Sequence, residues 1–488
     1  MSSIAAATSP QPAVQTSLTL CVDLDGTLIR TDLLWECLIS LLKTQPLSLF
    51  LLPVWLLGGR ANLKLQLAKR VRLDVANLPY RNEVVEFLRA EKSQGRRLAL
   101  VSACTTELAG QVARHLGLFD EVFASDQQQN LKGKRKAALL GDRFGLHGFE
   151  YLGDSPADLS VWQSANGAYV VGSERLAGKA ARLATVKRVF PVKQATFATW
   201  VSAVRGHHWF KNSLLFLPLA LAHKFDLHNW VMAGVGFILF GLCASGVYVL
   251  NDLLDLHSDR EHPWKRQRPF AAGDVSIPTG LLMCSVLLLI SLPGSFLLNP
   301  RFGVVLVFYL VLTMWYSLHL KRLALVDVFV LSGFYSTRIF AGSVITSTLL
   351  SQWFLSFSLF FFLSLAMAKR YSELVHASEL VERGQSGRGY IGKDRDVLMN
   401  LGIASGFSAV VIFSLYVHSP DLAPLYPNPR PLLLIAPIVA FWLSRVWLKA
   451  NRGELHEDPV TLALRDPLSY VVAVAAVLIF ALAMVKAH

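Results

Sequence analysis

The sequence predicts a protein in two parts, an N-terminal α/β domain with a parallel sheet and a C-terminal all-α bundle of membrane-spanning helices. Of the 488 residues, 53% are hydrophobic and only 17% are charged, whereas about a quarter of residues are charged in a soluble domain. After residue 200, runs of about 20 apolar residues recur, which is the length needed to span a bilayer. Before residue 200, short apolar runs that end in polar residues alternate with helical stretches, as in α/β domains.

The membrane half contains about nine predicted spans. They lie near residues 212–225, 230–250, 279–298, 302–320, 323–345, 353–371, 397–418, 432–450 and 468–486. Basic residues gather in the connection after every second span, which predicts that these connections and the N-terminal domain are cytoplasmic in a bacterial inner membrane. An odd number of spans then leaves the C-terminus outside. The same placement accounts for the net charge of +13, so we expect no nucleic-acid partner.

Composition also predicts the domain boundaries. The predicted parts are a disordered tail, an α/β domain, a linker or interfacial segment and a transmembrane domain, at residues 1–16, 17–190, 191–211 and 212–488. Residues 33–70 are apolar but are interrupted by Lys43 and Pro46, so they are too broken to span. We expect a helical cap over about 33–90 that also touches lipid.

Polar residues follow the predicted strands of the first domain. Asp23 and Asp25 follow the run "LTLCV". Ser102 follows "LALV", and "YL" is followed by "GDSPAD", which contains Asp154 and Asp158. In a parallel sheet such positions meet beyond the carboxyl ends of the strands. A carboxylate such as Asp23 can accept a phosphoryl group, and an acid such as Asp25 can protonate the leaving oxygen.

This half resembles the haloacid dehalogenase (HAD) phosphatases, which show a DxDGT motif, a strand-end Ser or Thr, a downstream Lys and a GDxxxD motif in that order. Here the motifs read "DLDGT" (23–27), "VSACT" (101–105), "KAALL" from Lys136 and "GDSPAD" (153–158). The resemblance covers roughly 17–190 and implies a HAD-like Rossmannoid fold.

The residue types fit phosphatase chemistry. Ser102 and Lys136 can hold the phosphoryl oxygens, with Lys132 and Lys134 as competing lysines. Mg²⁺ prefers hard oxygen ligands, which this site would supply from Asp23, Asp25, Asp154 and Asp158. The alternative is an inactive relic in which these residues are helix caps and turns.

The second predicted span ends in the charged segment "NDLLDLHSDREHPWKRQRP" (251–269). If the helix continues into it, Asp252, Asp255 and Asp259 share one face, with Asn251 beside them. Acids at membrane depth are costly and usually functional, and Mg²⁺ bound together with substrate phosphates would relieve their repulsion. The basic residues just after them are expected to grip the outer phosphate oxygens: Arg260, Lys265, Arg266 and Arg268.

This half resembles the UbiA superfamily of intramembrane prenyltransferases, whose NDxxDxxxD motif is matched by residues 251–259. The resemblance covers roughly 200–488. Most members carry a second Asp-rich motif in a later loop. The corresponding loop, 368–396, has no DxxxD and many basic residues, which indicates that it holds an anion without a second metal.

The absence of a second Asp-rich motif indicates one branch of the superfamily. "HHWFKN" (207–212), the segment from Asn251 to Gly273 and "AKRYSEL" (368–374) are similar to the polyprenyl-phosphate phosphoribosyltransferases. That resemblance implies transfer of 5-phosphoribose from phosphoribosyl pyrophosphate to a polyprenyl phosphate. The further residues expected to bind the substrates are Lys211, Lys321, Lys369, Arg370 and Tyr371. No role is assigned to Tyr316, Asp327, Arg338 and Glu373.

A phosphatase tethered at the same membrane face could remove the 5-phosphate, because tethering raises effective concentration to roughly millimolar. We therefore interpret the chain as two consecutive steps that yield polyprenylphosphoryl ribose. Two alternatives stay open: an aromatic prenyltransferase with a phosphatase or pyrophosphatase head, and a transporter with a regulatory head. The missing second DxxxD argues against the first, and the position of the acids at a span end argues against the second. The sequence does not indicate the polyprenyl chain length, the phosphatase substrate or the oligomeric state.

Overall fold

The computed structural model describes residues 17–125, 131–376, 389–420, 422, 425–455 and 459–485. The chain divides into two compact units, both discontinuous in sequence: Met1–Ala203 with Asp252–Leu281, and Val204–Asn251 with Leu282–His488. We call Asp252–Leu281 the motif segment, because it carries the predicted acids. The predicted tail and residues 377–388 of the predicted later loop lie outside the described residues.

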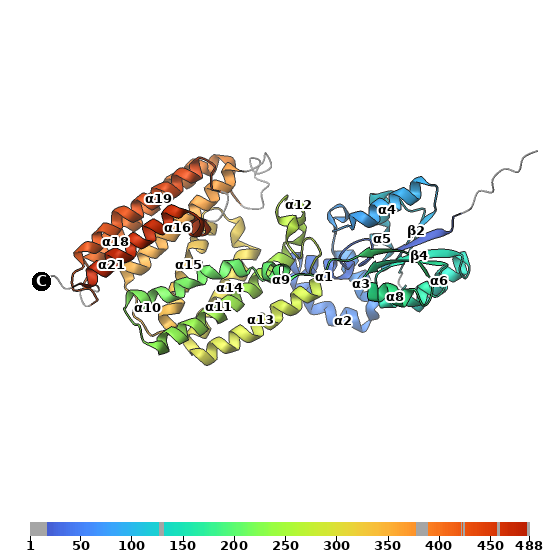
Figure 1. The fold of residues 1–488 in the computed structure, drawn as a ribbon, viewed down its shortest axis with the longest axis horizontal. Helices are drawn as coiled ribbons and strands as arrows, with labels where there is room; N and C mark the ends of the chain where they lie inside the picture. Colours follow the sequence, from blue (N-terminus) through green and yellow to red (C-terminus); the bar gives the residue numbers. More distant parts are fainter. Residues whose placement is uncertain are drawn as a thin grey trace, which may run out of the picture. The chain divides into compact units, whose positions relative to one another are not determined.

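The α/β domain forms the predicted parallel sheet, which has six strands within the described residues (Figure 1). Their order is β3-β2-β1-β4-β5-β6. The strands are β1 (Thr19–Asp23), β2 (Leu98–Thr105), β3 (Glu121–Ser125), β4 (Phe149–Gly153), β5 (Gly167–Gly172) and β6 (Thr185–Pro191). Side chains alternate between the faces, so Leu20 and Val22 pack with α4 and α5, while Cys21 packs with α6 and α7. Burial on both faces explains why these strands read as continuous apolar runs.

Helices connect and cover the strands. They are α1 (Leu33–Thr44), η1 (Pro46–Leu51), α2 (Leu52–Leu57), α3 (Gly59–Arg70), η2 (Val75–Asn77), α4 (Asn82–Ser93), α5 (Thr106–Leu116), α6 (Lys134–Phe144), η3 (Pro156–Asp158), α7 (Leu159–Trp162), α8 (Glu174–Ala180) and α9 (Phe197–Ala203). The motif segment adds α12 (Leu256–Glu261) and η5 (Lys265–Gln267).

The helices α1, α2 and α3 occupy the stretch predicted as a cap. The predicted cap extended to about residue 90, but α4 packs on the sheet, where Phe87 contacts the rings of Tyr169 and Phe190. Leu47, of η1, and Leu57, of α2, are exposed. Contact of this region with lipid stays a prediction.

The membrane unit confirms the predicted helical bundle. Eight helices of the described residues are long and apolar enough to cross a membrane, against about nine predicted. The helices of this part of the chain are α11 (Leu227–Leu254), α13 (Ile277–Leu298), α14 (Pro300–Leu318), α15 (Val326–Ile345), α16 (Gln352–Val375), α18 (Arg395–Val417), α19 (Ile435–Asn451), α20 (Pro459–Arg465) and α21 (Pro467–Met484), with the short turns η6 (Leu320–Arg322), η7 (Gly392–Asp394) and η8 (Arg430–Leu434). Helix α16 packs along α18, and both contact α19 (Figure 1).

The first predicted span, 212–225, is not one long helix. The chain there forms η4 (Gly206–Phe216), a 3₁₀ helix, followed by the short α10 (Leu217–Leu221). His223 has a φ of 51°, a left-handed conformation that ends a right-handed helix. The run contains Pro218 and ends in His223 and Lys224, but its apolar composition alone does not indicate where the backbone leaves the helical conformation.

A buried charge, Glu150, lies near the start of β4. The Glu150 carboxylate accepts hydrogen bonds from Arg96 and from Lys187 of β6. Arg96 also donates to the Leu18 carbonyl at 2.9 Å and to Glu91 at 2.6 Å. Burial raises the pKa of Glu150, but the two cations outweigh burial and hold that pKa below its ordinary value. Glu150 thus links β4, β6 and the connection before β2.

We expect Glu150→Gln to lower the free energy of unfolding of the α/β domain by about 3–5 kcal/mol, because it removes the anion from a buried ion pair. Since the pKa of Glu150 is lowered in the folded state, its contribution is present above the unfolded pKa of about 4.3 and is lost as the pH falls through the folded value. Hydrogen exchange of β4 and β5 amides in the full chain measures both effects. The exposed Glu86→Gln is the control, and equal protection in Glu150→Gln and wild type would contradict the prediction.

Candidate functional site

Three carboxylates converge at the carboxyl edge of the sheet. Asp23 ends β1 and Asp154 follows the neighbouring parallel strand β4, while Asp158 ends η3. Their oxygens lie within 4.8 Å of one another. Gly26 has a φ of 77°, and a Cβ there would lie 2.1 Å from Asp154 Oδ2. The glycine of the "DGT" motif is therefore needed both for the turn and for the approach of this carboxylate.

A buried lysine supplies the opposite charge. Lys136 of α6 donates to Asp23 Oδ1 at 2.7 Å and to the Tyr151 hydroxyl at 2.9 Å. That hydroxyl in turn donates to Asp158 Oδ1 at 3.0 Å. The two competing lysines, Lys132 and Lys134, are exposed. The structure therefore places Lys136 of the three candidates at the site, and it adds Tyr151, which sequence reasoning missed.

The surroundings hold two of the acids in different protonation states. Burial raises the pKa of Asp23 to about 6, with Lys136 opposing this effect and Asp158 adding to it. Burial, together with the charge of Asp32, raises the pKa of Asp25 to about 8. Near pH 7, Asp23 is thus mainly ionised and Asp25 mainly protonated, as a nucleophile and a proton donor should be.

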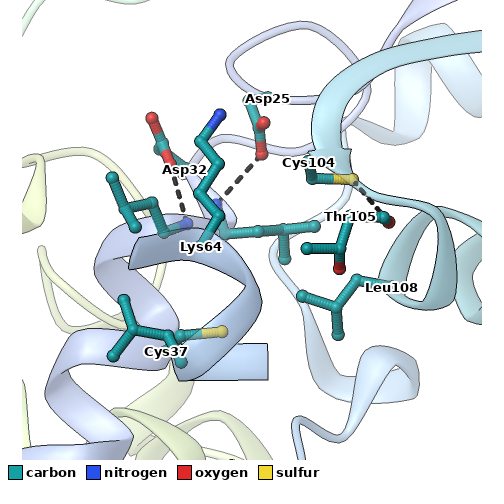
Figure 2. Close-up of a pocket in the computed structure, with 10 residues that line it drawn as sticks. Asp25, Asp32, Cys37, Lys64, Cys104, Thr105 and Leu108 are labelled. Carbon is teal, nitrogen blue, oxygen red and sulfur yellow. Dashed lines mark hydrogen bonds between the residues drawn. The ribbon is translucent and has the colours of Figure 1, made fainter. Parts of the chain in front are cut away.

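A pocket with an empty volume of about 280 Å³ lies beside Asp25 (Figure 2). Lys64 of α3 lines it and donates to the Ala103 carbonyl at 2.5 Å. The Thr105 hydroxyl also lines it and is buried without a hydrogen-bond partner in the described part of the chain. A cation and an unused hydroxyl beside a protonated acid can hold the oxygens of a phosphate ester. Much of the remaining wall is apolar: Leu33, Leu34, Cys37, Leu67, Cys104 and Leu108.

The strand-end hydroxyl predicted to bind phosphate lies deeper than expected. Ser102 is fully buried, and its oxygen accepts a hydrogen bond from the Cys104 amide at 3.1 Å. Thr105 of the same "VSACT" motif lines the pocket instead. Its place at the strand end was the only signal that could have found it. Lys64 had no such signal, because the reach of a cap lysine depends on how α3 folds back.

The three convergent carboxylates fit a divalent cation, since Mg²⁺ is held by hard oxygen ligands. Asp25, also predicted as a ligand, stands outside this group of described acids. Its Oδ1 accepts from the Leu33 amide at 3.0 Å, at the start of α1. This position suits proton transfer better than metal binding.

The sequence suggested that the acids of the motif segment lie on one continuous helix. In the structure they do not. Helix α11 ends at Leu254 and α12 begins at Leu256, with the break at Asp255. Arg268 donates to Asp252 Oδ1 at 3.2 Å and to Asp259 Oδ2 at 2.7 Å. The carboxylates of Asp252 and Asp259 therefore lie beside each other and share the guanidinium of Arg268.

The basic residues predicted to bind phosphate differ in their surroundings. Arg260 donates to both carboxylate oxygens of Glu36 and to the Ala271 carbonyl, so its guanidinium is engaged within the fold in this structure, and its binding of phosphate stays a prediction. Lys265 is half-buried and Arg266 is exposed. Sequence proximity to the acids could not distinguish an arginine that pairs within the fold from one that is available to a ligand.

The membrane unit contains a cavity with an empty volume of about 490 Å³. Lys211 of η4 lies 5.5 Å from the Tyr335 ring centroid. Arg338 of α15 donates to Asn212 Oδ1 at 3.0 Å and to the Tyr309 hydroxyl at 3.1 Å. Arg338 is thus buried among neutral groups and aromatic faces, an environment that an anionic ligand would complete. The lining residues are Lys211, Tyr248, Asn251, Tyr309, Thr313, Tyr316, Ser317, Phe334, Tyr335 and Arg338.

Asn251 supplies a further ligand group. Its Oδ1 is buried and has no hydrogen-bond partner within the described residues, although a buried amide oxygen normally has one. Because oxygen ligands of this type suit Mg²⁺, the first residue of the acid motif fits a cation-bound phosphate. The cations Arg338 and Lys211 line the same cavity.

Four of the other predicted binding residues lie outside the described lining of this cavity: Lys321, Lys369, Arg370 and Tyr371. Arg370 forms a buried ion pair with Asp327 and donates to Glu373 at 2.6 Å. The Tyr371 hydroxyl donates to Asn451 at 2.7 Å. In this structure Arg370 and Tyr371 thus make contacts within the bundle, and their binding of substrate phosphate stays a prediction. Tyr316, left without a role, joins the cavity to this network by donating to Asp327 at 2.7 Å.

Comparison with known proteins identifies relatives of both parts. Residues 213–464 match the UbiA prenyltransferase family, and residues 20–163 match the haloacid dehalogenase-like hydrolases. The chain is 39% identical over 478 residues to the uncharacterized protein y4nM of Sinorhizobium fredii, covering 96% of this chain and 91% of that protein. It is 40% identical over 184 residues to the decaprenyl-phosphate phosphoribosyltransferase of Mycobacterium tuberculosis, covering 37% of this chain and 61% of that enzyme. A UbiA homolog from Archaeoglobus fulgidus, solved with DMAPP and Mg²⁺, aligns with a TM-score of 0.45 at 15% identity over 59% of this chain and 99% of that one.

We expect Asp154→Asn to remove one divalent-cation site per chain, because it takes away one of the three convergent carboxylates. Titration of the full-length protein with Mn²⁺, followed by electron paramagnetic resonance, counts bound ions without requiring turnover. Asp142→Asn, which changes an exposed carboxylate on α6, is the matched control and should bind as the wild type does. Unchanged stoichiometry and affinity in Asp154→Asn would show that these acids do not form a metal site.

Proposed function

Because this chain belongs to the UbiA prenyltransferase family and carries a haloacid dehalogenase-like hydrolase domain, we propose that it is a bifunctional multi-pass membrane enzyme. Its membrane half transfers 5-phosphoribose from phosphoribosyl pyrophosphate to a polyprenyl phosphate. Its α/β domain then removes the 5-phosphate and leaves polyprenylphosphoryl ribose. The observation that carries this proposal is the membrane cavity, which is lined by the cations Arg338 and Lys211 and by Asn251, whose buried side-chain oxygen has no hydrogen-bond partner within the described residues. The identity to an enzyme named for a phosphoribosyl transfer supports it.

In the transfer, an oxygen of the lipid phosphate attacks C1 of the ribose, and the bond from C1 to the pyrophosphate oxygen breaks. Lys211 and Arg338 hold phosphate oxygens in the cavity. Mg²⁺, when bound, neutralises the leaving pyrophosphate. The residues that would hold it are those of the acid motif: Asn251, Asp252, Asp255 and Asp259. The apolar bundle accommodates the polyprenyl tail.

In the second step, Asp23 attacks the phosphorus of the 5-phosphate. The bond from phosphorus to the ribose oxygen breaks, and Asp25 gives its proton to that oxygen. Asp25 then accepts a proton from the water that hydrolyses the aspartyl phosphate, which releases inorganic phosphate. Lys136 binds the phosphoryl oxygens, and a Mg²⁺ ion held by the convergent carboxylates would neutralise their charge.

We place the α/β domain in the cytoplasm of a bacterial cell, at the inner membrane. The support is the concentration of lysine and arginine in the connections after every second predicted span. Phosphoribosyl pyrophosphate is a highly charged, water-soluble substrate, so its binding residues must open to an aqueous compartment. A cytoplasmic phosphatase on the same chain then meets the phosphorylated lipid at high effective concentration.

Asp252→Asn should reduce ribosylation of the lipid by about a hundredfold or more, because it removes a charged metal ligand from the transferase motif. Mass analysis of lipids after incubation with phosphoribosyl pyrophosphate, Mg²⁺ and a polyprenyl phosphate measures the transfer. Asp274→Asn, an exposed acid of the same segment, should retain it. Near-normal turnover of Asp252→Asn at saturating Mg²⁺ would contradict the assigned metal site.

Asp23→Asn should block the phosphatase and leave the transferase active, because the nucleophile belongs to the α/β domain alone. The variant should accumulate a lipid-linked ribose that keeps its 5-phosphate, whereas the wild type releases inorganic phosphate. The same mass analysis separates the two products. Identical lipid masses would instead favour an aromatic prenyltransferase or a transferase whose phosphatase acts on pyrophosphate, and would exclude two consecutive steps.

A further inference from the structure

A buried ion pair holds the motif segment to the α/β domain. Arg260 of α12 donates from its two terminal nitrogens to the two oxygens of Glu36 on α1, at 3.0 and 2.7 Å. The side chains are only 8% and 6% exposed. The Arg260 Nε also donates to the Ala271 carbonyl at 3.0 Å. One guanidinium therefore fixes α12, the turn at Ala271 and α1 to one another, in the bidentate geometry that gives strong and directional pairs.

A second charge pair uses the same face of α1. Lys43 lies seven residues after Glu36, two helical turns along, so both project toward the same side. Its Nζ lies 3.2 Å from Oδ1 of Asp255, one of the acids of the transferase motif. Helix α1 thus places a cation directly against a predicted metal-binding carboxylate.

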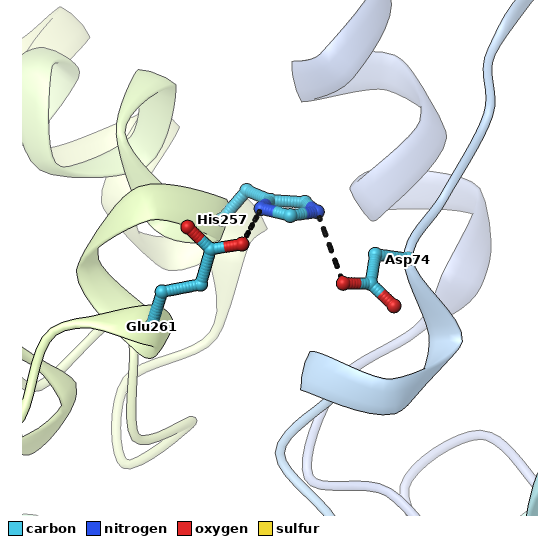
Figure 3. A group of neighbouring side chains, drawn as sticks. All are labelled: Asp74, His257 and Glu261. Atoms are coloured by element: carbon cyan, nitrogen blue, oxygen red, sulfur yellow. Dashed lines mark ion pairs between the residues drawn. The ribbon is translucent and has the colours of Figure 1, made fainter. Parts of the chain in front are cut away.

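Two other contacts extend this surface. Gly273 has a φ of 74°, and a Cβ there would lie 2.6 Å from Cβ of Arg30 and 3.2 Å from its carbonyl oxygen, so the backbones are in close approach. His257 of α12 lies 3.4 Å from Glu261 and 3.8 Å from Asp74, which precedes η2 (Figure 3). The motif segment thus contacts the α/β domain at two further points, near Gly273 and near His257.

Other residues of the same helix line the proposed phosphatase pocket. Leu33, Leu34 and Cys37 of α1 line the pocket beside Asp25 (Figure 2). The Leu33 amide also donates to Asp25 Oδ1 at 3.0 Å. One helix thus contributes to the phosphatase pocket and holds the acid motif of the transferase.

We propose that α1 is a positioning element for the transferase: through Glu36 and Arg260 it fixes the acid motif, so that lipid ribosylation requires the α/β domain even when phosphatase chemistry is blocked. The part of this proposal that concerns lipid ribosylation rests on the proposed function. Glu36 touches no reacting atom in this scheme and acts through Arg260. The Asp23→Asn chain keeps this contact and retains transfer, whereas a chain that lacks the contact loses it.

The test compares Glu36→Gln, Arg260→Gln and the double variant with the wild type in the full-length protein. Loss of a buried pair should speed hydrogen exchange of amides in residues 252–281 by about a hundredfold or more, and it should lower lipid ribosylation. Because both side chains act as one pair, the double variant should be no worse than either single variant. Hydrolysis of p-nitrophenyl phosphate needs only the phosphatase site. Because the Glu36–Arg260 pair is not part of that site, hydrolysis should stay within about twofold of the wild type.

The matched control is Arg30→Gln, since the ion pair of Arg30 with Asp274 is 41% and 45% exposed and such pairs contribute little. Unchanged exchange and transfer in Glu36→Gln would overturn the proposal, as would strictly additive losses in the double variant. If Glu36→Gln also lost p-nitrophenyl phosphate hydrolysis, the lipid ribosylation of Arg260→Gln would decide the proposal. Arg260 lies in the motif segment, so this variant changes no residue of α1 or of the phosphatase pocket. A wild type that transfers no ribose would refute the proposed function, and the exchange measurement would still decide whether α1 holds the segment.

Discussion

Buried carboxylates determine much of the arrangement in both parts of this chain, because like charges held out of water require cations among them. In the α/β domain, Lys136 lies against Asp23 and bridges to Asp158 through Tyr151. In the motif segment, Arg268 lies between Asp252 and Asp259. Each predicted metal site thus already contains a positive side chain. A divalent cation would add to, or exchange with, a charge balance that the fold itself supplies.

The same constraint separates structural arginines from those available for substrate. Arg260 and Arg370 each meet a buried carboxylate, Glu36 and Asp327 respectively, so their charges are used within the fold. Arg338 has a phenol, an amide and a backbone carbonyl as hydrogen-bond partners instead. A buried cation among neutral partners is the less common arrangement, and it is the one that leaves electrostatic potential for an anionic ligand.

Helix α1 connects the haloacid dehalogenase-like domain to the acid motif of the UbiA domain by direct contacts, which go beyond tethering. A flexible tether raises local concentration but does not orient either site. Here α1 lines the pocket beside Asp25 with Leu33, Leu34 and Cys37. The same helix forms ion pairs with the motif segment through Glu36 and Lys43. The pocket beside Asp25 and the acids of the motif segment therefore share a structural element.

The sequence by itself determined the two-part architecture, the parallel sheet and the acids at its edge, because burial of apolar runs and the common direction of parallel strands follow from local pattern. It also indicated Asp23, Asp25, Lys136 and Asp154, which lie on or next to strands and one short helix. Only the tertiary structure decided which charges pair: Glu36 and Arg260 are 224 positions apart, and nothing local links them. The reach of Lys64, the break at Asp255 and the interrupted first span depended likewise on packing and on backbone conformations such as that of His223. Side-chain pairing across hundreds of residues is set by distance in space, which composition and spacing do not encode.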